Sequence, residues 1–305
     1  MENQRVLVTG GGGFIGANLA NKLAENNDVV ALDDGYLGTP ENVSEDVEYV
    51  EQSVLDDDLP TDVDVVFHLA ALSSYAMHED NPTHGARVNV EGFVNTVEQA
   101  RDDGCDTVVY ASTSSIYGSR TEPSPEDMDV TVNTGYEASK MARETYAEYF
   151  QNHYDLTLAG MRFFSVYQGY GGAEEHKGEY ANVIAQFADD LASGDAPKLY
   201  GDGEQTRDFT HVDDIVRGLV LAAEHELNDV YNLGTGEAYD FNTVVEMLND
   251  ELGTDIEPEY VENPIPEDVY VHDTCADFSK MHEATGWEPE ISFEEGIELV
   301  CAPYT

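Results

Sequence analysis

A glycine-rich turn directly after the first apolar run of the sequence leaves few folds open to this chain. The residues VLVTGGGGFIG place Gly10, Gly13 and Gly16 at three-residue intervals between a strand-like segment and a helix-like segment. Such glycines let the backbone approach a pyrophosphate, which the first amides of the helix then face. The next strand-like run ends in Asp33 and Asp34, whose carboxylates suit the ribose hydroxyls of NAD and repel the 2′-phosphate of NADP. The pattern therefore predicts an NAD site.

The first half of the chain alternates short apolar runs with amphipathic stretches, as β-α-β units of a parallel sheet do. We expect strands at residues 5–9, 29–32, 47–50, 65–69, 107–111, 158–163 and 230–233. We expect helices at residues 15–25, 85–101, 136–154, 180–192, 212–224 and 242–252. This order predicts an α/β fold with a doubly wound, Rossmann-like parallel sheet and a smaller, discontinuous C-terminal lobe. The expected NAD-binding domain is 1–166 plus roughly 205–250, and the expected substrate-binding lobe is roughly 167–204 and 251–305.

The charge balance is extreme, with 13 Lys and Arg against 63 Asp and Glu and a formal net charge of -50. The acids are spread through periodic sequence that contains aromatic residues, so we expect a folded protein and not an acidic tail. At molar salt the screening length falls to about 3 Å, which relieves the self-repulsion of such a surface. We therefore expect a cytoplasmic protein of a salt-accumulating microbe. Nucleic acid is disfavoured as a partner, because the chain has few cations to neutralise phosphates.

Other features of the sequence argue against metal, disulfide and membrane classes. Cys105, Cys275 and Cys301 are widely spaced and form no Cys-x-x-Cys pair, so neither a disulfide framework nor a zinc site is expected. Adjacent acids such as Asp57 and Asp58 are interpreted as solvated surface, and no metal site is predicted. No charged-then-apolar leader opens the sequence, and no apolar run approaches the ~18 residues of a membrane span. We expect a soluble protein.

A tyrosine and a lysine four residues apart are the candidate pair for catalysis. In GYEASKMARE, Tyr136 and Lys140 would share one helix face, and Thr113 closes a neighbouring strand. A tyrosine with a pKa of about 10 needs a shift of ~3 units to act as a base at pH 7, which is ~4 kcal/mol. One cation ~4 Å away in a partly screened site supplies about that much. We therefore predict that Lys140, assisted by the positive nicotinamide of NAD, makes Tyr136 a general base.

Eight segments recur in an order that resembles the extended short-chain dehydrogenase/reductase family. They are VTGGGGFIG, FHLAA, RVNVEG, YASTSSIYG, YEASK, RFFSVY, YGDGEQTRDFTHVDD and YNLGTGE, and they span nearly the whole chain. Within that family the sequence is similar to NAD-dependent nucleotide-sugar epimerases of the UDP-glucose 4-epimerase type. The resemblance implies that the chain is an isomerase of a UDP-sugar such as UDP-glucose or UDP-galactose. It also implies transient hydride transfer to tightly held NAD, and a homodimer.

The resemblance implies roles for residues that match the family motifs. The expected catalytic residues are Thr113, Tyr136 and Lys140, with the Thr113 hydroxyl beside the sugar. The expected cofactor-binding residues, besides Tyr136 and Lys140, are Gly10, Gly13, Phe14, Ile15, Gly16, Asp33, Asp34, Leu69, Ala70, Ala71 and Asn89. The expected substrate-binding residues, besides Thr113, are Ser165, Asn182 and Arg207, with Arg207 on the diphosphate. For Asn182 a role in starting a helix, and for Arg207 a surface pair with Asp208, stay open as alternatives.

The sequence departs from the family pattern at several ligand positions. Ser53 stands where relatives commonly have an adenine-binding Asp, and Ser165 stands where Asn is usual. Gln168 stands where Gly is usual, and Ile265 stands where many relatives place a second phosphate-holding Arg. These differences leave the identity of the nucleotide sugar open.

Three alternative functions remain to be weighed. A nucleotide-sugar dehydratase is disfavoured, because Thr113 is followed by Ser114 and Ser115 and not by the acids that expel water. An NAD-dependent sugar dehydrogenase that releases NADH is the main alternative, because the substrate positions are altered. A non-catalytic NAD sensor is the third, and the intact Thr113, Tyr136 and Lys140 argue against it.

Overall fold

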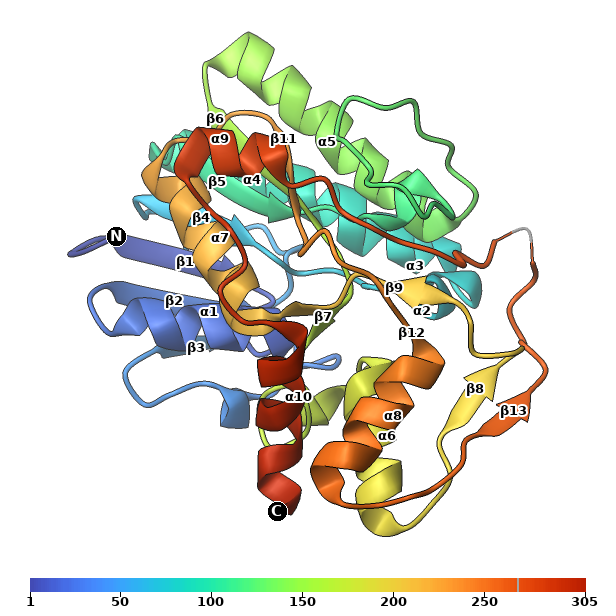
Figure 1. Cartoon of the computed structure of the whole chain (residues 1–305). Coiled ribbons are helices and arrows are strands. Elements are labelled where there is room, and N and C mark those ends of the chain that lie inside the picture. The colour runs from blue at the N-terminus through green and yellow to red at the C-terminus, as the bar shows by residue number, and fades with distance from the viewer. Residues whose placement is uncertain (268) are drawn as a thin grey trace.

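The computed structural model describes residues 1–267 and 269–305, which form a seven-stranded parallel sheet between layers of helices (Figure 1). The strands are β1 Arg5–Thr9, β2 Asp28–Asp33, β3 Glu48–Glu51, β4 Val65–His68, β5 Thr107–Ala111, β6 Thr157–Phe163 and β11 Val230–Leu233. Their order is β3-β2-β1-β4-β5-β6-β11, so the winding reverses between β1 and β4. Doubly wound sheets bind ligands at the carboxyl ends of strands beside such a reversal. The predicted fold class is confirmed.

Alternate residues of each strand face opposite layers of helices. On β1, Val6 and Val8 belong to one hydrophobic cluster and Leu7 belongs to the other. The first cluster lies under α1 Phe14–Ala24, α7 Val212–Glu224 and α9 Ser279–Thr285, and the second under α4 Gly92–Asp103 and α5 Gly135–Tyr154. Because both faces of the sheet are buried, its strands are continuous apolar runs and do not alternate with polar residues.

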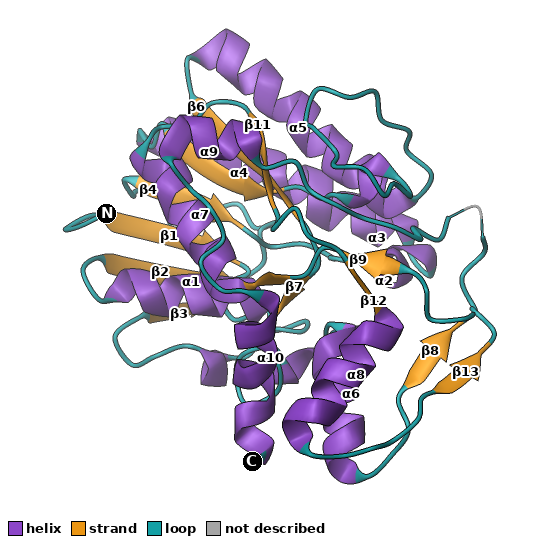
Figure 2. Cartoon of the chain, in the orientation of Figure 1, coloured by secondary structure: helices purple, strands orange, loops and turns teal. Residues whose placement is uncertain are grey.

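A third hydrophobic cluster lies to one side of the sheet. It is formed by α6 Val183–Ser193, α8 Phe241–Leu252 and α10 Phe293–Cys301. Short strand pairs accompany these helices: β7 Val166–Tyr167 with β10 Thr210–His211, β8 Lys198–Tyr200 with β13 Glu259–Val261, and β9 Thr206–Arg207 with β12 Tyr239–Asp240. Figure 2 shows the pair β8 and β13 farthest from the main sheet, beyond α6 and α8. This region therefore has a core of its own, next to the carboxyl edge of the sheet.

The helix expected at residues 85–101 is divided into three helical segments. α3 Pro82–Ala86 passes into a π-helical turn, η2 Arg87–Glu91, which passes into α4. Such π turns often occur at functional sites, and this one carries Asn89. The remaining short helices are η1 Pro40–Asn42, α2 Tyr75–Glu79, η3 Ser115–Tyr117, η4 Glu175–Tyr180 and η5 Ala302–Tyr304.

The C-terminal tail is more helical than its acids and prolines indicate. The sequence analysis expected no helix there, yet α9 and α10 both form. Ser292 caps α10 by accepting from the amide of Glu295, whose carboxylate accepts from the amide of Ser292. This capping box satisfies two amides that would otherwise lack acceptors. The helix expected at 180–192 begins at Val183, because η4 is a separate turn before it.

Two buried acids of the DFTHVDD segment hold distant parts of the chain. The carboxylates of Asp208 and Asp214 both accept hydrogen bonds from backbone amides far away in the sequence. The amides are those of Thr235, Gly236 and Ala276 for Asp208, and those of Glu290 and Ile291 for Asp214. These acids therefore stabilise the return of the C-terminal segment onto the main domain.

The three cysteines are free and buried. Burial raises their pKa values, that of Cys105 to about 11 and that of Cys301 to about 12. Such thiols stay protonated at neutral pH and pack as small apolar side chains. Within the described part of the chain, no helix combines the length and the apolar character that a membrane span requires.

Candidate active site

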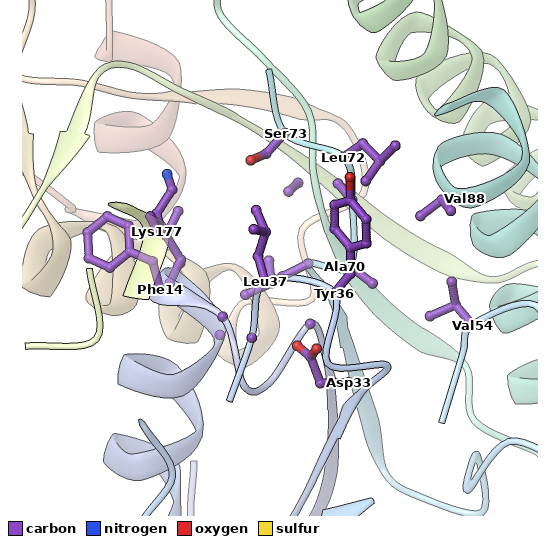
Figure 3. Close-up of a pocket in the computed structure, with 18 of the residues that line it drawn as sticks. Phe14, Asp33, Tyr36, Leu37, Val54, Ala70, Leu72, Ser73, Val88 and Lys177 are labelled. Atoms are coloured by element: carbon purple, nitrogen blue, oxygen red, sulfur yellow. The ribbon is translucent and has the colours of Figure 1, made fainter. Parts of the chain in front are cut away.

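A pocket of about 300 Å³ lies at the carboxyl ends of β1 and β4, beside the reversal in strand order (Figure 3). Most of the residues predicted for the site line it: Gly10, Gly13, Phe14, Ile15, Gly16, Asp33, Asp34, Leu69, Ala70, Ala71, Thr113, Tyr136, Lys140 and Ser165. Asn89, Asn182 and Arg207 are not part of its lining. One cavity therefore brings together the predicted cofactor residues and the predicted catalytic residues.

The glycine turn leaves no room for side chains. Gly10 has a φ of 69°, and a Cβ added there would lie 2.8 Å from the amide nitrogen of Ala70. A Cβ added to Gly16 would lie 2.0 Å from the carbonyl oxygen of Gly10. α1 begins directly after this turn, so its first amides lack helical acceptors and carry the positive end of the helix dipole. This bare backbone cradle fits the pyrophosphate of a dinucleotide.

Asp33 lies at the end of β2 and lines the pocket. Its two carboxylate oxygens accept hydrogen bonds from the amide of Gly12 at 3.1 Å and the amide of Gly35 at 2.9 Å. Burial raises the pKa of Asp33, and these backbone hydrogen bonds oppose that rise. Each oxygen has a second lone pair, which leaves it able to accept from a ribose hydroxyl. The neighbouring Asp34 is exposed and lies at the rim of the pocket.

Asn89 supports the pocket wall from behind. Its Nδ2 donates to the carbonyl of Leu72 at 3.0 Å, and its Oδ1 accepts from the amide of Leu72 at 2.8 Å. Nδ2 also donates to the hydroxyl of Ser139 on α5 at 2.9 Å. Asn89 is fully buried, and its two hydrogen bonds to the backbone of Leu72 position that residue, which lines the pocket. The sequence analysis did not single out Leu72 or Val54, since apolar lining residues cannot be distinguished from core residues by type.

Thr113, Tyr136 and Lys140 come together in the same pocket. Tyr136 and Lys140 lie one turn apart on α5, with Lys140 Nζ 5.8 Å from the centre of the Tyr136 ring. Thr113 follows β5 and lines the same pocket, and its hydroxyl lies 2.9 Å from that of Ser115. The ammonium of the buried Lys140 donates to the carbonyl of Ala111 at 3.0 Å. The three side chains could therefore contact one bound substrate.

The pKa of Tyr136 differs from the sequence-based expectation. Burial raises this pKa, and the hydrogen bond with Thr113 and the charge of Arg143 oppose the rise without cancelling it. The pKa of Lys140 is itself lowered well below its usual value by burial and by the charge of Arg143. The side chains of the protein therefore do not produce the expected lowering of the Tyr136 pKa, because desolvation of the phenolate outweighs the nearby cations.

Arg143 is a cation of the site that the sequence analysis missed. Its guanidinium is fully buried and donates to the carbonyls of Asn89 at 2.6 Å, Ala70 at 2.7 Å and Ala111 at 3.2 Å. Burial lowers its pKa to about 10, so it stays charged at neutral pH. It therefore ties the ends of two strands to the π turn and places a positive charge beneath Lys140. Its position three residues after Lys140 on the same helix was the only signal in the sequence.

The predicted substrate residues are dispersed. Ser165 lines the pocket, whereas Asn182 caps α6 by accepting from the amide of Ile184. Arg207 lies between the rings of Phe241 and Tyr270, 5.7 and 5.5 Å from their centres. Its guanidinium donates to three backbone carbonyls, those of Thr206, Val271 and His272. The alternative of a surface pair between Arg207 and Asp208 is wrong, because Asp208 is fully buried and bound to amides.

Comparison with known proteins agrees with this geometry. Residues 6–234 match the NAD dependent epimerase/dehydratase family. The chain belongs to this family. It is 35% identical over 314 residues to UDP-glucose 4-epimerase of Mycolicibacterium smegmatis, with 96% of each chain covered.

Two solved structures show the same fold over the whole chain. The first is UDP-N-acetylglucosamine 4-epimerase from Methanobrevibacter ruminantium M1 in complex with UDP-N-acetylmuramic acid. Its TM-score is 0.91 at 29% identity, over 99% of this chain and 98% of that chain. The second is UDP-glucose 4-epimerase from Thermus thermophilus in complex with NAD, whose TM-score is 0.87 at 30% identity, over 98% of each chain.

Membership of this family confirms the predicted enzyme class and the predicted cofactor. The protein is an NAD-dependent enzyme, and the relatives named above are nucleotide-sugar epimerases, which are isomerases. The glycine cradle and Asp33 are consistent with NAD in the pocket. The relatives named here differ in their sugars.

Proposed function

We propose that this protein epimerises a UDP-sugar at C4, with UDP-glucose and UDP-galactose as the first candidate substrates, on NAD that stays bound. The observation that carries the proposal is the convergence of Thr113, Tyr136 and Lys140 in the pocket that also holds the glycine turn. The similarity to the M. smegmatis enzyme supports the choice of sugar. The M. ruminantium enzyme makes UDP-N-acetylglucosamine the second candidate.

In this proposal Tyr136 is the general base that accepts the proton of the sugar hydroxyl. The Thr113 hydroxyl, which lines the same pocket as Tyr136, orients that sugar hydroxyl. Arg143 stays charged, and its charge favours the phenolate over the phenol, although desolvation of the phenolate outweighs it in the protein alone. NAD, when bound, supplies the hydride chemistry of the family and a further positive charge.

The placement of acids around the pocket argues against a dehydratase. Among the described residues that line it, the only acids lie at the end of β2, three strands away from β5 and Thr113. Thr113 is followed by serines, and the hydroxyl of Ser115 lies 2.9 Å from that of Thr113. Glu137 on α5 belongs to the capping box of that helix, where its carboxylate accepts from the amides of Asn133 and Thr134. The site therefore provides a base without an elimination partner.

The test is to incubate the protein separately with UDP-glucose, UDP-N-acetylglucosamine, UDP-glucuronate and free glucose, in molar KCl. Chromatography measures the C4 epimer of each, and absorbance at about 340 nm measures NADH. We expect the epimer of UDP-glucose to form without net NADH. Steady release of NADH from a free sugar would favour the dehydrogenase, and loss of water from the sugar would favour the dehydratase. NAD binding without turnover of any substrate would favour the sensor.

We also propose that the smaller lobe, roughly 167–204 and 251–305, binds the nucleotide, with Ser165, Asn182 and Arg207 on the substrate side. The position of Ser165 in the pocket lining supports this proposal. Arg207 donates from both Nη atoms to carbonyls, so its remaining donor capacity for a diphosphate is small. Changing Arg207 to Met should weaken the binding of UDP more than the binding of ADP-ribose. An equal loss of affinity for the two ligands would contradict the assignment of Arg207 to the substrate.

Replacement of Asp33 by Asn should shift the cofactor preference toward NADP. The variant keeps the side-chain size but removes the charge that suits ribose hydroxyls and repels a 2′-phosphate. A hydrogen bond to a charged group is worth ~1.5–3 kcal/mol, so NAD affinity should fall about tenfold to a hundredfold. Calorimetry measures the affinities for NAD and NADP. Their ratio is compared because a general loosening of the turn would weaken the binding of both cofactors. An unchanged ratio would contradict the role of Asp33, and Asp46→Asn, at an exposed position outside the pocket lining, is the matched control.

We propose that the protein works in the cytoplasm of a salt-accumulating microbe, which the net charge of -50 supports. The free energy of unfolding should therefore rise as KCl increases from about 0.1 M to about 2 M, because the Debye length falls from ~10 Å to a few Å. Urea titrations followed by circular dichroism measure this change. A stability that falls with KCl would contradict the proposal.

We further propose a homodimer formed through α5. Tyr146, Tyr149 and Tyr154 are exposed on that helix by 42%, 41% and 41%. Tyrosines are enriched in protein interfaces because they bury a large area at a low entropic cost. Light scattering in molar KCl should give twice the mass of one chain, and a monomer at all concentrations would contradict the dimer.

A further inference from the structure

A loop of the smaller lobe reaches back over the NAD pocket. The segment between β7 and α6 is glycine-rich, and three of its residues line the pocket: Ala173, His176 and Lys177. Figure 3 shows the amino group of Lys177 beside Phe14, the first residue of α1 after the glycine turn. The loop is therefore adjacent to the cradle that fits a pyrophosphate.

A buried glutamate holds both ends of this loop. Glu174 is fully buried, and its Oε2 accepts from the amides of Gln168 at 2.7 Å and Gly169 at 2.8 Å. Its Oε1 accepts from the amide of Asn182 at 2.7 Å. A carboxylate with several backbone donors is strongly bound in place. The loop between these anchors, which carries Lys177, is thus closed into a defined shape.

Gln168 ties the same loop to the helix of the glycine turn. Its Oε1 accepts from Nδ2 of Asn18 at 3.1 Å, and its Nε2 donates to Oδ1 of Asn18 at 2.9 Å. Asn18 lies in α1, one turn after Phe14, and also donates to the carbonyl of Phe14. The glutamine that departs from the family pattern therefore forms a reciprocal amide pair with α1. That pair fixes the loop relative to the cradle.

The ammonium of Lys177 has neither a hydrogen-bonded nor an ion-paired partner within residues 1–267 and 269–305, and it lies 5.5 Å from the centre of the Phe14 ring. Burial lowers its pKa, and Glu174 opposes this change. The only other Lys or Arg among the described lining residues is Lys140, whose ammonium is bound to Ala111. In a chain with 13 Lys and Arg against 63 acids, a half-buried cation without such a partner indicates an anionic ligand.

We propose that Lys177 binds the diphosphate of the bound dinucleotide from the loop side of the pocket. The amides at the start of α1 would bind the same group from the other side, so that the cofactor is held by both lobes. Gln168 and Glu174 are positioning residues, because they hold the loop and do not reach the ligand themselves. This grip from a second lobe suits an enzyme whose cofactor has to stay bound through turnover.

Calorimetry with Lys177→Met tests this proposal in three arms at one KCl concentration. ADP-ribose carries the diphosphate of the cofactor, adenosine lacks phosphate, and UDP carries the diphosphate of a nucleotide sugar. We expect Lys177→Met to lower the affinity for ADP-ribose about tenfold to a hundredfold, and to keep the affinity for adenosine within about twofold of that of the parent protein. The exposed Lys198→Met is the matched control, since it changes the net charge equally and should leave ADP-ribose unchanged. Lys177→Arg should restore most of the affinity.

Two results would overturn the proposal. Unchanged binding of ADP-ribose in Lys177→Met would show that the cation does not contact the cofactor. Weaker binding of UDP with unchanged ADP-ribose would assign Lys177 to the diphosphate of the substrate. A thermal unfolding curve equal to that of the parent protein is expected for Lys177→Met, because the substitution removes no hydrogen bond or ion pair among the described residues.

Gln168→Ala tests whether the loop acts through Lys177. Made in the parent protein, this substitution should lower the affinity for ADP-ribose severalfold. Made in the Lys177→Met variant, it should have no further effect on that affinity. A purely structural role of Gln168 would weaken ADP-ribose equally in both backgrounds. Equal effects would therefore contradict the assignment of Gln168 as a positioning residue.

Discussion

Replacing Tyr136 by phenylalanine should lower kcat for epimerisation by about 10²- to 10⁴-fold, the usual contribution of a general base. Phenylalanine keeps the ring, whose centre lies 5.8 Å from Lys140 Nζ, and removes only the hydroxyl that would accept the proton. The glycine cradle and Asp33 remain intact, so NAD should stay bound. Single-turnover and steady-state assays with the UDP-sugar that the parent enzyme accepts measure the change, and calorimetry measures NAD.

The matched control for this variant is Tyr110→Phe. Tyr110 lies on β5, is 1% exposed and is not among the residues that line the pocket. It should keep its kcat within about a factor of two to three, because it contacts neither cofactor nor substrate. Turnover of Tyr136→Phe at the rate of this control would refute Tyr136 as the base. Loss of NAD from Tyr136→Phe would instead show that the residue acts in cofactor binding.

Replacing Arg162 by methionine should reduce the free energy of unfolding by about 3–5 kcal/mol, the typical cost of breaking a buried ion pair. Arg162 Nη2 lies 2.7 Å from a carboxylate oxygen of Glu144, and the two side chains are only 6% and 8% exposed. Arg162 also donates to the hydroxyl of Tyr117 at 2.7 Å. The variant leaves the Glu144 carboxylate buried with its main partner gone, in a region that joins α5 to β6.

Urea unfolding at one fixed KCl concentration measures this loss. Lys22→Met is the matched control, because its ion pair with Glu25 is 61% and 57% exposed and is expected to contribute less than about 1 kcal/mol. The double variant Arg162→Met with Glu144→Leu should recover part of the stability, since no charge is then buried. A loss in Arg162→Met no larger than in the control would show that the pair is solvated.

The strands and most helices could be predicted because their signals are local. β1, β5, β11 and α7 have the predicted bounds, and the other strands of the main sheet differ by one residue at one or both ends. The short strands β7, β8, β9, β10, β12 and β13 were not predicted. The hydrophobic pattern did not predict the helices whose form depends on contacts with distant segments of the chain. The π turn around Asn89 depends on contacts with Leu72 and α5, and α9 and α10 depend on packing against the two cores. The composition of the tail, rich in proline and acids, hides both helices.

Some residues of the candidate site could be predicted from the sequence and others could not. Short motifs whose spacing indicates their chemistry contain Gly10, Asp33, Tyr136 and Lys140, and these residues line one pocket. Lys177 lies in a polar loop with no motif, so its approach to Phe14 could not be inferred from spacing. Arg207 stays a proposed substrate residue on the strength of its motif, and only the structure shows that its guanidinium also donates to three backbone carbonyls.

By itself, the sequence determined the parallel α/β sheet and the dinucleotide turn, because periodicity and motif spacing act within a few residues of each other. It also indicated the three proposed catalytic residues, which line one pocket. Only the tertiary structure decided the direction in which the pKa values of Tyr136 and Lys140 shift, and the placement of Lys177 and Arg143. Those properties depend on desolvation and on groups that approach from distant segments. The charge environment of the pocket therefore depends on groups from separate segments: the carbonyl of Ala111, the buried guanidinium of Arg143 and the loop that carries Lys177. No short stretch of sequence contains all three groups.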